Sequence, residues 1–383
     1  MNSDDNFDII VAGAGPAGST FALEMEGSGL KLALVDKAHF PRDKVCGDAI
    51  PGRAVRVLRQ LSPSESQRFD AFASKNRIRG GKAVAPNQHS LSIFYKNEGY
   101  TAPRMDFDFH LFTGVLQNPK VTVFQGVAIK KVQVSESGVA ALLSDQKRLR
   151  ADLIIGCDGA NSVVARQLSQ KKVDHRHHCA AVRAYFRKVN MPRLDVMEIF
   201  LLKNYLPGYF WIFPLPNGLF NVGFGMLSQD VINKRINLRQ CFLQVIEQET
   251  GLESYFAHAE RVGEVAGFGL PLGSKKVPVS GDRFMLAGDA ASLVDPVTGE
   301  GIGNAMLSAK IAASIAASCF ENNRFDAHFL KQYDQALYGK LWPELRNKSL
   351  IQKLLKDRSW LINLCIHQAA NNPLIKRIVK KII

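Results

Sequence analysis

The sequence lacks the usual marks of a membrane-spanning or exported protein. No stretch approaches the roughly 20 uninterrupted apolar residues of a membrane-spanning helix, and residues 1–6 have neither the basic nor the apolar region of a signal peptide. The six cysteines are scattered without a C-x-x-C pair, which argues against a zinc site or a dense disulfide framework. We therefore expect a globular, cytoplasmic protein with reduced thiols and no bound metal.

Acidic residues are also in deficit. The chain has 49 Lys and Arg against 35 Asp and Glu, and residues 326–383 alone hold 11 basic and 4 acidic side chains, which is +7, half of the net +14. A basic surface attracts nucleic acid or an anionic membrane. No nucleic-acid module and no basic groove with interleaved aromatics is recognisable, so the charge favours a membrane surface and no nucleic acid.

What the chain does contain is a large apolar fraction and one informative stretch. With 383 residues, 46% of them hydrophobic, it can bury a large core, and its length predicts two or three domains. Residues 7–36 read as an apolar strand, a Gly-Ala-Gly-Pro-Ala-Gly turn, a helix, a second apolar strand and a final Asp. This order is typical of a βαβ unit that binds a dinucleotide.

Each special residue of this unit has a physical reason. Gly13 permits the tight turn, Gly15 lets the backbone approach a pyrophosphate, and Gly18 lets the helix pack closely on the sheet. The helix N-terminus offers unpaired N–H groups to the phosphates. Asp36, at about the expected spacing of 20 residues, is placed to reach the ribose hydroxyls.

Two later stretches extend this site. The loop 40–48 is basic: Arg42 is placed to pair with a phosphate or ribose, and Cys46 with Gly47 lets the backbone approach the rest of the nucleotide. Cys46 equally fits a small buried residue, because nothing visible sets its pKa. Asp289 follows a buried strand and so falls on the ligand-facing edge of a parallel sheet.

The loop 296–304 leads into an alanine-rich helix. The N-terminus of this helix would favour negative charge on the ring of a bound, reduced cofactor. Arg104 opens another helix, with acidic residues near its first turn, and also fits an ordinary surface cation. The cluster His175 to Cys179 invites a metal interpretation, but its ligands lie within five residues of one basic segment, which favours a solvated loop.

The middle of the chain alternates as antiparallel strands do. Tyr209, Trp211 and Phe213 share one strand face, and the small Gly223 follows. Such a stripe is usually core, but it also describes an apolar wall beside a cavity. The pattern alone leaves both interpretations open.

Six motifs in the chain can be compared with known families: the βαβ fingerprint, Lys44-x-Cys46-Gly47, Arg104-x-x-Phe107-Asp108-x-x-Leu111, Cys157-Asp158-Gly159, Ala287-Gly288-Asp289-Ala290, and Tyr209-x-Trp211-x-Phe213-Pro214 followed after eight residues by Gly223-x-Gly225. Together these motifs resemble the FAD-dependent oxidoreductases of the p-hydroxybenzoate hydroxylase class. Within that class the chain is similar to the geranylgeranyl reductase family, although Asp48 stands where the family more often has a second glycine.

The resemblance implies a fold and a cofactor. The fold is α/β, a Rossmann-type FAD-binding domain interleaved with an antiparallel β-sheet substrate domain, plus a C-terminal helical segment. The expected FAD-binding parts are 1–75, 104–175 and 276–325, the substrate parts 76–103 and 176–275, and the basic helical region 326–383. The implied FAD contacts are Asp36 at the ribose, Val127 at the adenine through its backbone, Ala17 and Arg104, Asp289 at the centre, and Gly301 and Ile302 at the isoalloxazine.

The family's reaction is saturation of isoprenoid double bonds by reduced flavin, with a hydride from N5 and a proton to the other carbon. The alkene develops cationic character, so a dry cavity with aromatic faces suits it. Tyr209, Trp211, Phe213 and Gly223 are the implied substrate contacts, with Cys46, Tyr209 and Trp211 the catalytic candidates. A second G-x-G-x-x-G is missing, so an NAD(P)H donor would bind only transiently.

Two other functions remain open. A flavin monooxygenase or halogenase shares the cofactor domain, and fold does not fix chemistry; halogenases favour Trp-x-Trp-x-Ile-Pro, whereas this chain has Tyr209 and Phe213. The third possibility is a membrane-bound flavoprotein that has an electron-transfer or regulatory role and no small-molecule turnover of its own.

The last eleven residues predict a short basic amphipathic helix. It predicts peripheral contact with the inner face of a membrane; a terminal helix docked on the protein is the alternative. Its apolar positions are Leu374, Ile375, Ile378, Val379, Ile382 and Ile383, and its basic positions are Lys376, Arg377, Lys380 and Lys381.

Overall fold

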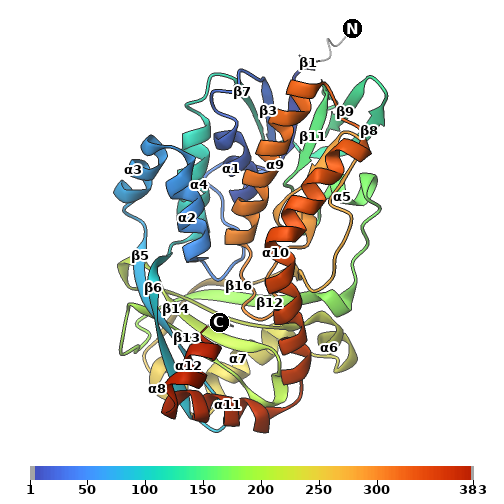
Figure 1. Cartoon of the computed structure of the whole chain (residues 1–383). Helices are drawn as coiled ribbons and strands as arrows, with labels where there is room; N and C mark the ends of the chain where they lie inside the picture. Colours follow the sequence, from blue (N-terminus) through green and yellow to red (C-terminus); the bar gives the residue numbers. More distant parts are fainter. Residues whose placement is uncertain (1–4, 381–383) are drawn as a thin grey trace.

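The computed structural model describes residues 5–380, which form two lobes, one above the other in Figure 1. Within these residues the upper lobe contains a six-stranded sheet that is parallel except for its edge strand β17. The strand order is β17 (Ser280–Gly281), β18 (Phe284–Leu286), β11 (Leu153–Gly156), β2 (Ile9–Ala12), β3 (Leu32–Asp36) and β7 (Val121–Gln125). The central strands are apolar throughout because both faces of a parallel sheet are covered.

Helices cover one face of this sheet, and a small sheet, antiparallel except where β1 meets β10, shares its hydrophobic core. The helices of this lobe are α1 (Pro16–Glu24), α2 (Gly52–Leu61), α3 (Pro63–Ala71), α4 (Arg104–Val115), α5 (Val163–Leu168) and α9 (Ile302–Asn322). The small sheet is ordered β1 (Asp5–Asn6), β10 (Arg148–Ala151), β9 (Gly138–Leu143) and β8 (Ile129–Ser135).

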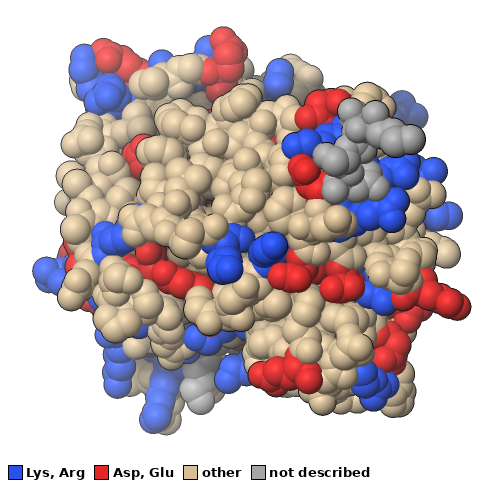
Figure 2. All heavy atoms as spheres, turned by 90° about the horizontal axis from the view of Figure 1, so that it is seen from above, with Lys and Arg blue, Asp and Glu red and all other residues tan. Residues whose placement is uncertain are grey.

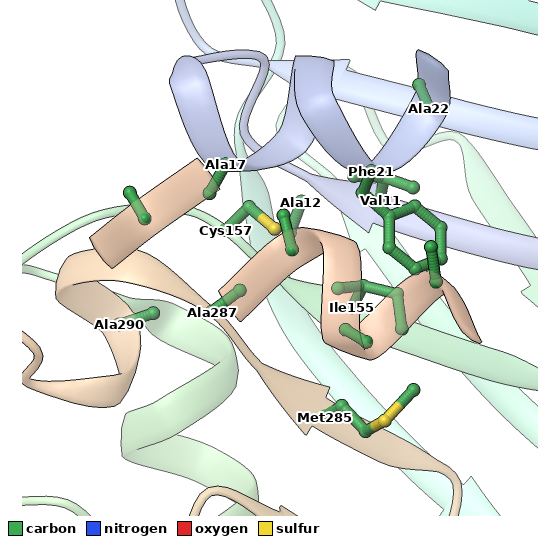
Figure 3. Close-up of a cluster of buried hydrophobic side chains, with 14 of the residues drawn as sticks. Val11, Ala12, Ala17, Phe21, Ala22, Ile155, Cys157, Met285, Ala287 and Ala290 are labelled. Carbon is green, nitrogen blue, oxygen red and sulfur yellow. The ribbon is translucent and has the colours of Figure 1, made fainter. Parts of the chain in front are cut away.

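Helix α1 packs on the sheet through Phe21, and its N-terminus meets α9 and the turn after β18 through small residues. Figure 3 shows Phe21 of α1 in one cluster with Val11, Ile155 and other side chains of the sheet. A Cβ on Gly288 would lie 3.1 Å from the Cβ of Ala305 in α9 and 3.4 Å from the Cβ of Ala17 in α1. The turn after β18 therefore reaches the N-terminus of α1 only because these residues are small.

Helix α9 has the length and apolar composition of a membrane span, by those two criteria only, yet 61% of its apolar window is buried inside the protein. It contacts α1, α2 and α10 (Ala327–Leu355). It therefore packs as an interior helix of the upper lobe.

The lower lobe is built on an eight-stranded sheet, antiparallel except where β13 meets β5. Phe242 and Val245 of α7 (Leu238–Gln248) join Phe210 and Phe224 in its core. The strand order is β16 (Glu260–Pro271), β12 (His178–Arg187), β15 (Leu219–Leu227), β14 (Tyr209–Pro214), β13 (Val196–Phe200), β5 (Asn76–Val84), β6 (Ser90–Thr101) and β4 (Ala49–Ile50). Short helices α6 (Ser228–Asn233) and α8 (Glu253–Phe256) complete it.

The interleaved α/β fold is confirmed, with one difference from the expected segmentation and one strand that the sequence did not predict. Strand β4 pairs with β6, so the first segment, 1–75, also reaches the lower sheet and carries the loop 40–48 between the lobes. Strand β16 pairs with β12 along the whole length of that strand. Its sequence does not reveal it, because Gly263, Gly267 and Gly269 interrupt the alternation.

The C-terminal helices lie along the lower lobe. Helix α10 descends from the upper lobe, and α11 (Ser359–Asn371) and α12 (Pro373–Val379) follow at its base (Figure 1). On α12, Ile375 and Val379 pack against the protein, whereas Leu374 and Ile378 are 73% and 61% exposed. The expected single apolar face is therefore divided, with one edge docked and one in solvent. Lys381, Ile382 and Ile383 lie outside the described residues.

Candidate active site

The glycine turn at the start of α1 has the geometry that a bound pyrophosphate requires. Gly13 has φ +93°, and a Cβ there would lie 2.5 Å from the carbonyl oxygen of Cys157. A Cβ on Gly18 would lie 1.8 Å from the carbonyl oxygen of Gly13. Gly15 is the N-cap, and the first turn contains no acidic residue. The positive end of the helix dipole is therefore available to an anion.

Asp36 holds this turn in place. Its Oδ2 accepts a hydrogen bond from the Ala14 N–H at 2.8 Å, and its Oδ1 accepts one from the Ala38 N–H at 2.9 Å. The Val127 N–H donates to the carbonyl oxygen of Asp36 at 3.2 Å. The implied ribose and adenine contacts thus lie side by side at the ends of β3 and β7.

The basic loop and α4 meet beside the same turn. The Arg42 Nη2 lies 3.4 Å from where a Cβ on Gly15 would be, and its Nη1 is 2.9 Å from the Asp108 Oδ2. Arg104 makes two hydrogen bonds to Asp108, at 2.7 and 2.6 Å. Arg104 is only 3% exposed, so the surface-cation alternative is wrong. Burial opposes ionisation of Asp108, but Arg104 and then Arg42 hold its pKa below the usual value.

Asp289 joins this group from the other end of the chain. Its Oδ2 lies 3.2 Å from the Lys44 Nζ, and a Cβ on Gly301 would lie 3.4 Å from its Oδ1. Burial raises the pKa of Asp289, but the charge of Lys44 outweighs this and the net pKa is lowered. Ile302 begins α9 at this point. A carboxylate, a cation and a glycine-bounded helix N-terminus therefore converge where the central part of a dinucleotide would lie.

The two faces of β14 separate core packing from the site. Phe210 and Ile212 are fully buried in the lower-lobe core. Tyr209, Trp211 and Phe213 occupy the opposite face, with ring centroids 5.9 Å and 6.2 Å apart along the strand. The core role belongs to the intervening residues, and the stripe itself faces away from that core.

This aromatic face lies against the loop 40–48. A Cβ on Gly47 would lie 3.3 Å from the Phe213 ring and 3.8 Å from the Trp211 Nε1. Gly223, opposite Trp211 in the sheet, has no room for a side chain, because a Cβ there would lie 2.1 Å from the indole Cζ2. The structure thus brings the expected substrate residues and the expected cofactor loop into direct contact.

A polar network that sequence reasoning missed joins these two parts. The Trp211 Nε1–H donates to the Asn221 Oδ1 at 2.8 Å, and the Asn221 Nδ2 donates to the Cys46 carbonyl at 2.7 Å and to the Asp48 Oδ2 at 2.8 Å. The Tyr185 hydroxyl also donates to the Asp48 Oδ2, at 2.8 Å. The available signal was a lone Asn in the apolar strand 219–227, where an unpaired amide would be costly.

Asp48 is fully buried and has φ +61°, a conformation that favours glycine. Its Oδ1 has no hydrogen-bond partner among the described residues. Burial raises its pKa to about 7, and the hydrogen bond from Asn221 opposes that rise. The carboxyl group therefore holds a proton over part of the neutral range, and it shares the Asn221 amide with the Cys46 carbonyl.

The remaining candidates lie around these groups. Cys46 is half-buried, and its side chain interacts with Arg104. The Tyr209 hydroxyl donates to the carbonyl oxygen of Thr298 in the loop before α9. Next in this loop, burial and then Asp295 raise the pKa of Glu300 to about 7. His175 to His177 form a separate turn, and within residues 5–380 no three His, Cys, Asp or Glu side chains are grouped as metal ligands.

The set fits a dinucleotide that ends in a planar ring: a glycine turn without side-chain bulk, cations beside it, a carboxylate at its centre and an aromatic wall beyond. Comparison with known proteins agrees. The FAD binding domain family matches residues 6–254. Digeranylgeranylglycerophospholipid reductase of Thermoplasma acidophilum is 26% identical over 99% of this chain and 96% of its own length. Menaquinone reductase of Mycobacterium tuberculosis is 30% identical over 83% of this chain and 78% of its own length.

Solved structures share the fold. A geranylgeranyl bacteriochlorophyll reductase-like protein of Thermoplasma acidophilum superposes with a TM-score of 0.83 and 22% identity over 100% of both chains. A flavin-dependent brominase superposes with a TM-score of 0.80 and 19% identity over 98% of this chain and 93% of its own. At such identities these two likenesses show the fold alone, and the choice of reaction depends on the site.

Proposed function

Because the chain belongs to the FAD-binding family and, within it, to the geranylgeranyl reductase family of flavin-dependent oxidoreductases, we propose that it saturates carbon–carbon double bonds of an isoprenoid lipid or prenyl quinone. The observation that carries this proposal is the contact between the aromatic face of β14 and the loop that holds Cys46 and Gly47. That contact sets an apolar wall beside the expected position of the flavin ring.

FAD, when bound and reduced, supplies a hydride to an alkene carbon. The protein supplies the surroundings in which positive character at the other carbon is tolerated. Trp211 and Phe213 present aromatic faces, which attract a cation through the ring quadrupole, and the apolar wall excludes water. Asn221 fixes the indole by its hydrogen bond. A rigid wall of this kind orients an apolar chain, which has few polar groups of its own to be held by.

The catalytic candidates divide into two roles. Burial raises the pKa of Tyr209, and its hydroxyl donates to Thr298, so this side chain keeps its proton and positions the loop before α9. Cys46 belongs to the cofactor loop 40–48; its side chain interacts with Arg104, and its carbonyl oxygen accepts a hydrogen bond from Asn221. We assign Cys46 to the proton-transfer side of the site and Tyr209 with Trp211 to the substrate wall.

The test is anaerobic reoxidation of the photoreduced holoenzyme by a geranylgeranyl lipid and by a prenyl quinone, with the fully saturated lipid as control. We expect the unsaturated substrate to reoxidise the flavin and mass spectrometry to show a gain of two hydrogens per bond. Failure of every unsaturated isoprenoid to reoxidise the flavin would reject the proposal.

A flavin-dependent halogenase or monooxygenase is the second candidate, favoured by the brominase likeness. The site argues against it at two positions, Tyr209 and Phe213, which replace the Trp and Ile of the halogenase motif. Substrate-triggered oxygen consumption by the reduced enzyme is the outcome that would favour this candidate over the reductase.

The lipid substrate places the enzyme at a membrane surface. We propose that it is a cytoplasmic protein that binds the membrane peripherally, and that NAD(P)H is at most a transient donor. Support comes from exposed apolar residues on the last helices, Trp360 and Leu364 on α11 and Leu374 and Ile378 on α12, with Lys376 and Arg377 exposed beside them.

A further inference from the structure

The net positive charge of the protein is unevenly distributed. On the face seen in Figure 2, basic and acidic side chains are interspersed in a band with uncharged residues on both sides. Basic residues gather instead in a cavity of about 620 Å³ between two segments that connect the lobes, 169–176 between α5 and β12 and 275–278 between β16 and β17. Ligand cavities are common at such junctions between domains.

The cavity wall has a large excess of cations. One carboxylate, Asp174, lies among them, and its Oδ1 and Oδ2 are 3.0 Å from the Arg176 Nε and 3.2 Å from the Lys275 Nζ. The hydrogen bond from Arg176 holds the pKa of Asp174 well below its usual range, so it is ionised and offsets one of five positive charges. The five cations are Lys171, Lys172, Arg176, Lys275 and Lys276.

The excess continues into an adjoining cavity. A second cavity of about 170 Å³ shares Arg176 and Gln229 with the first. It adds His177 from the turn before β12, and Lys353 and Lys356 from the end of α10. Lys356 is 2.7 Å from Asp230 and is therefore neutralised. Within residues 5–380, no carboxylate oxygen lies within 4.0 Å of the Lys353 Nζ, so the basic lining extends toward the C-terminal helices.

The floor of the larger cavity adjoins the cofactor site. The Lys171 Nζ donates to the carbonyl oxygens of Asp289 at 3.0 Å and Ala290 at 2.9 Å, on the turn that carries the Asp289 carboxylate. Burial lowers the pKa of Lys171 to about 8, so it is mostly protonated at neutral pH. None of the glycine-turn residues, Arg42 or Arg104 lines this cavity, so it is distinct from the cradle for the pyrophosphate of FAD.

We propose that this cationic cavity binds the phosphate or diphosphate group of a second anionic ligand. Clustered Lys and Arg donors suit phosphate oxygens, and the volume is that of a site for a whole small molecule rather than one ion. Two sources share this chemistry: the phosphorylated end of an isoprenoid, which rests on the proposed function, and the phosphates of a dinucleotide electron donor, which does not.

The first experiment measures binding of inorganic pyrophosphate to the FAD-loaded full-length protein by calorimetry. In the double variant Lys172→Glu/Lys275→Glu we expect affinity to fall at least about tenfold, because two attractions become repulsions. Lys131→Glu, an exposed residue on β8 with the same charge change per site, is the control and should bind as the wild type does. Equal binding by the double variant, or an equal loss in the control, overturns the proposal.

A second variant guards against misfolding. Lys172→Gln changes one exposed side chain, and FAD content with thermal unfolding reports whether the fold is intact. If the double variant loses FAD, the single variant should still weaken pyrophosphate binding several-fold, and no weakening in a folded Lys172→Gln protein overturns the proposal.

The source is identified by displacement of pyrophosphate. Displacement by geranylgeranyl phosphate but not by geranylgeraniol identifies the lipid end, and displacement by NADPH identifies the donor. Binding of pyrophosphate that neither displaces means an inorganic anion site only and overturns the proposal. These measurements need no turnover, so a failed reductase assay leaves the result for the cavity readable.

Discussion

The two sides of the site are held together by different forces. On the cofactor side, glycines with no room for a Cβ and ion pairs such as Lys44–Asp289 set the geometry. On the substrate side, aromatic rings lie on one strand face and a single amide, Asn221, ties Trp211 to the cofactor loop. From this difference we infer that cofactor binding depends on backbone shape and charge, whereas substrate orientation depends on packing. Substitutions on the two sides should therefore fail in different assays.

The largest effect is expected from Gly18→Ala. The new Cβ would lie 1.8 Å from the Gly13 carbonyl oxygen, which is backbone and cannot turn aside. We expect loss of FAD and a fall in the free energy of unfolding of about 3 kcal/mol or more, the scale of a severe packing defect. Flavin absorbance measures the FAD content, and denaturant unfolding measures the free energy of unfolding.

The matched control is Gly339→Ala in α10, where a Cβ meets nothing within 4 Å. It should stabilise the protein by up to about 1 kcal/mol, because Ala costs less backbone entropy than Gly in a helix. If both variants retained FAD equally, the tight packing of α1 on the turn would not be what shapes the cofactor site.

The next largest effect separates the two faces of β14. Phe210→Ala empties a fully buried core position and should cost about 3–5 kcal/mol of stability, with FAD binding and turnover per folded enzyme little changed. Trp211→Ala should cost less stability but reduce isoprenoid turnover more than tenfold, roughly the scale of a lost positioning contact. Unfolding curves give the loss of stability, and single-turnover flavin reoxidation gives the loss of turnover.

One outcome would contradict the assignment of the two faces of β14. Should Trp211→Ala lose stability as Phe210→Ala does and keep its turnover, the aromatic stripe is ordinary core.

How much of this arrangement the sequence predicts depends on the range of the contacts. The residues of the fingerprint are near neighbours, so spacing alone places Gly13, Gly18 and Asp36. The pair Lys44–Asp289 joins residues 245 positions apart. The basic loop and the strand end were each assigned to the cofactor site from the sequence, but nothing in the sequence pairs these two side chains. The role of Asn221 could not be predicted, because a hydrogen bond across a sheet and an interlobe loop leaves no periodic trace in the sequence.

A smaller effect is expected from Asp48, which lies where the two sides meet. Its native pKa of about 7 exceeds the model-peptide value of 3.8, so between those values the native state binds more protons than the unfolded state. The free energy of unfolding therefore falls as pH rises from about 4 to about 7 and levels off above. Asp48→Asn removes this term, and we expect the variant to gain stability relative to the wild type at pH 8 but not at pH 4.

Glu300 is a second buried carboxyl group that should contribute to this pH dependence. Its pKa is raised from 4.5 to about 7, also mainly by burial, so Glu300→Gln should flatten the same part of the stability profile independently. Denaturant unfolding of the FAD-loaded proteins from pH 4 to pH 8 checks both. An unchanged slope in Asp48→Asn would mean that the carboxyl group stays ionised in the folded protein.

The smallest effect concerns the membrane contact, because α12 is short and half of its apolar face is already docked. Leu374 and Ile378 remain exposed one turn apart, beside Lys376 and Arg377. Each basic residue near an anionic surface contributes on the order of 1 kcal/mol, and an interfacial helix this short binds reversibly. Leu374→Ser/Ile378→Ser should reduce sedimentation with anionic liposomes several-fold, and added salt should likewise weaken sedimentation of the wild type.

The matched control is Leu116→Ser, at an exposed apolar residue of the upper lobe, which should leave sedimentation unchanged. If the α12 variant sediments as the wild type does while retaining FAD, the exposed edge of α12 is not the membrane contact, and the docked edge, Ile375 and Val379, accounts for the apolar pattern of this helix.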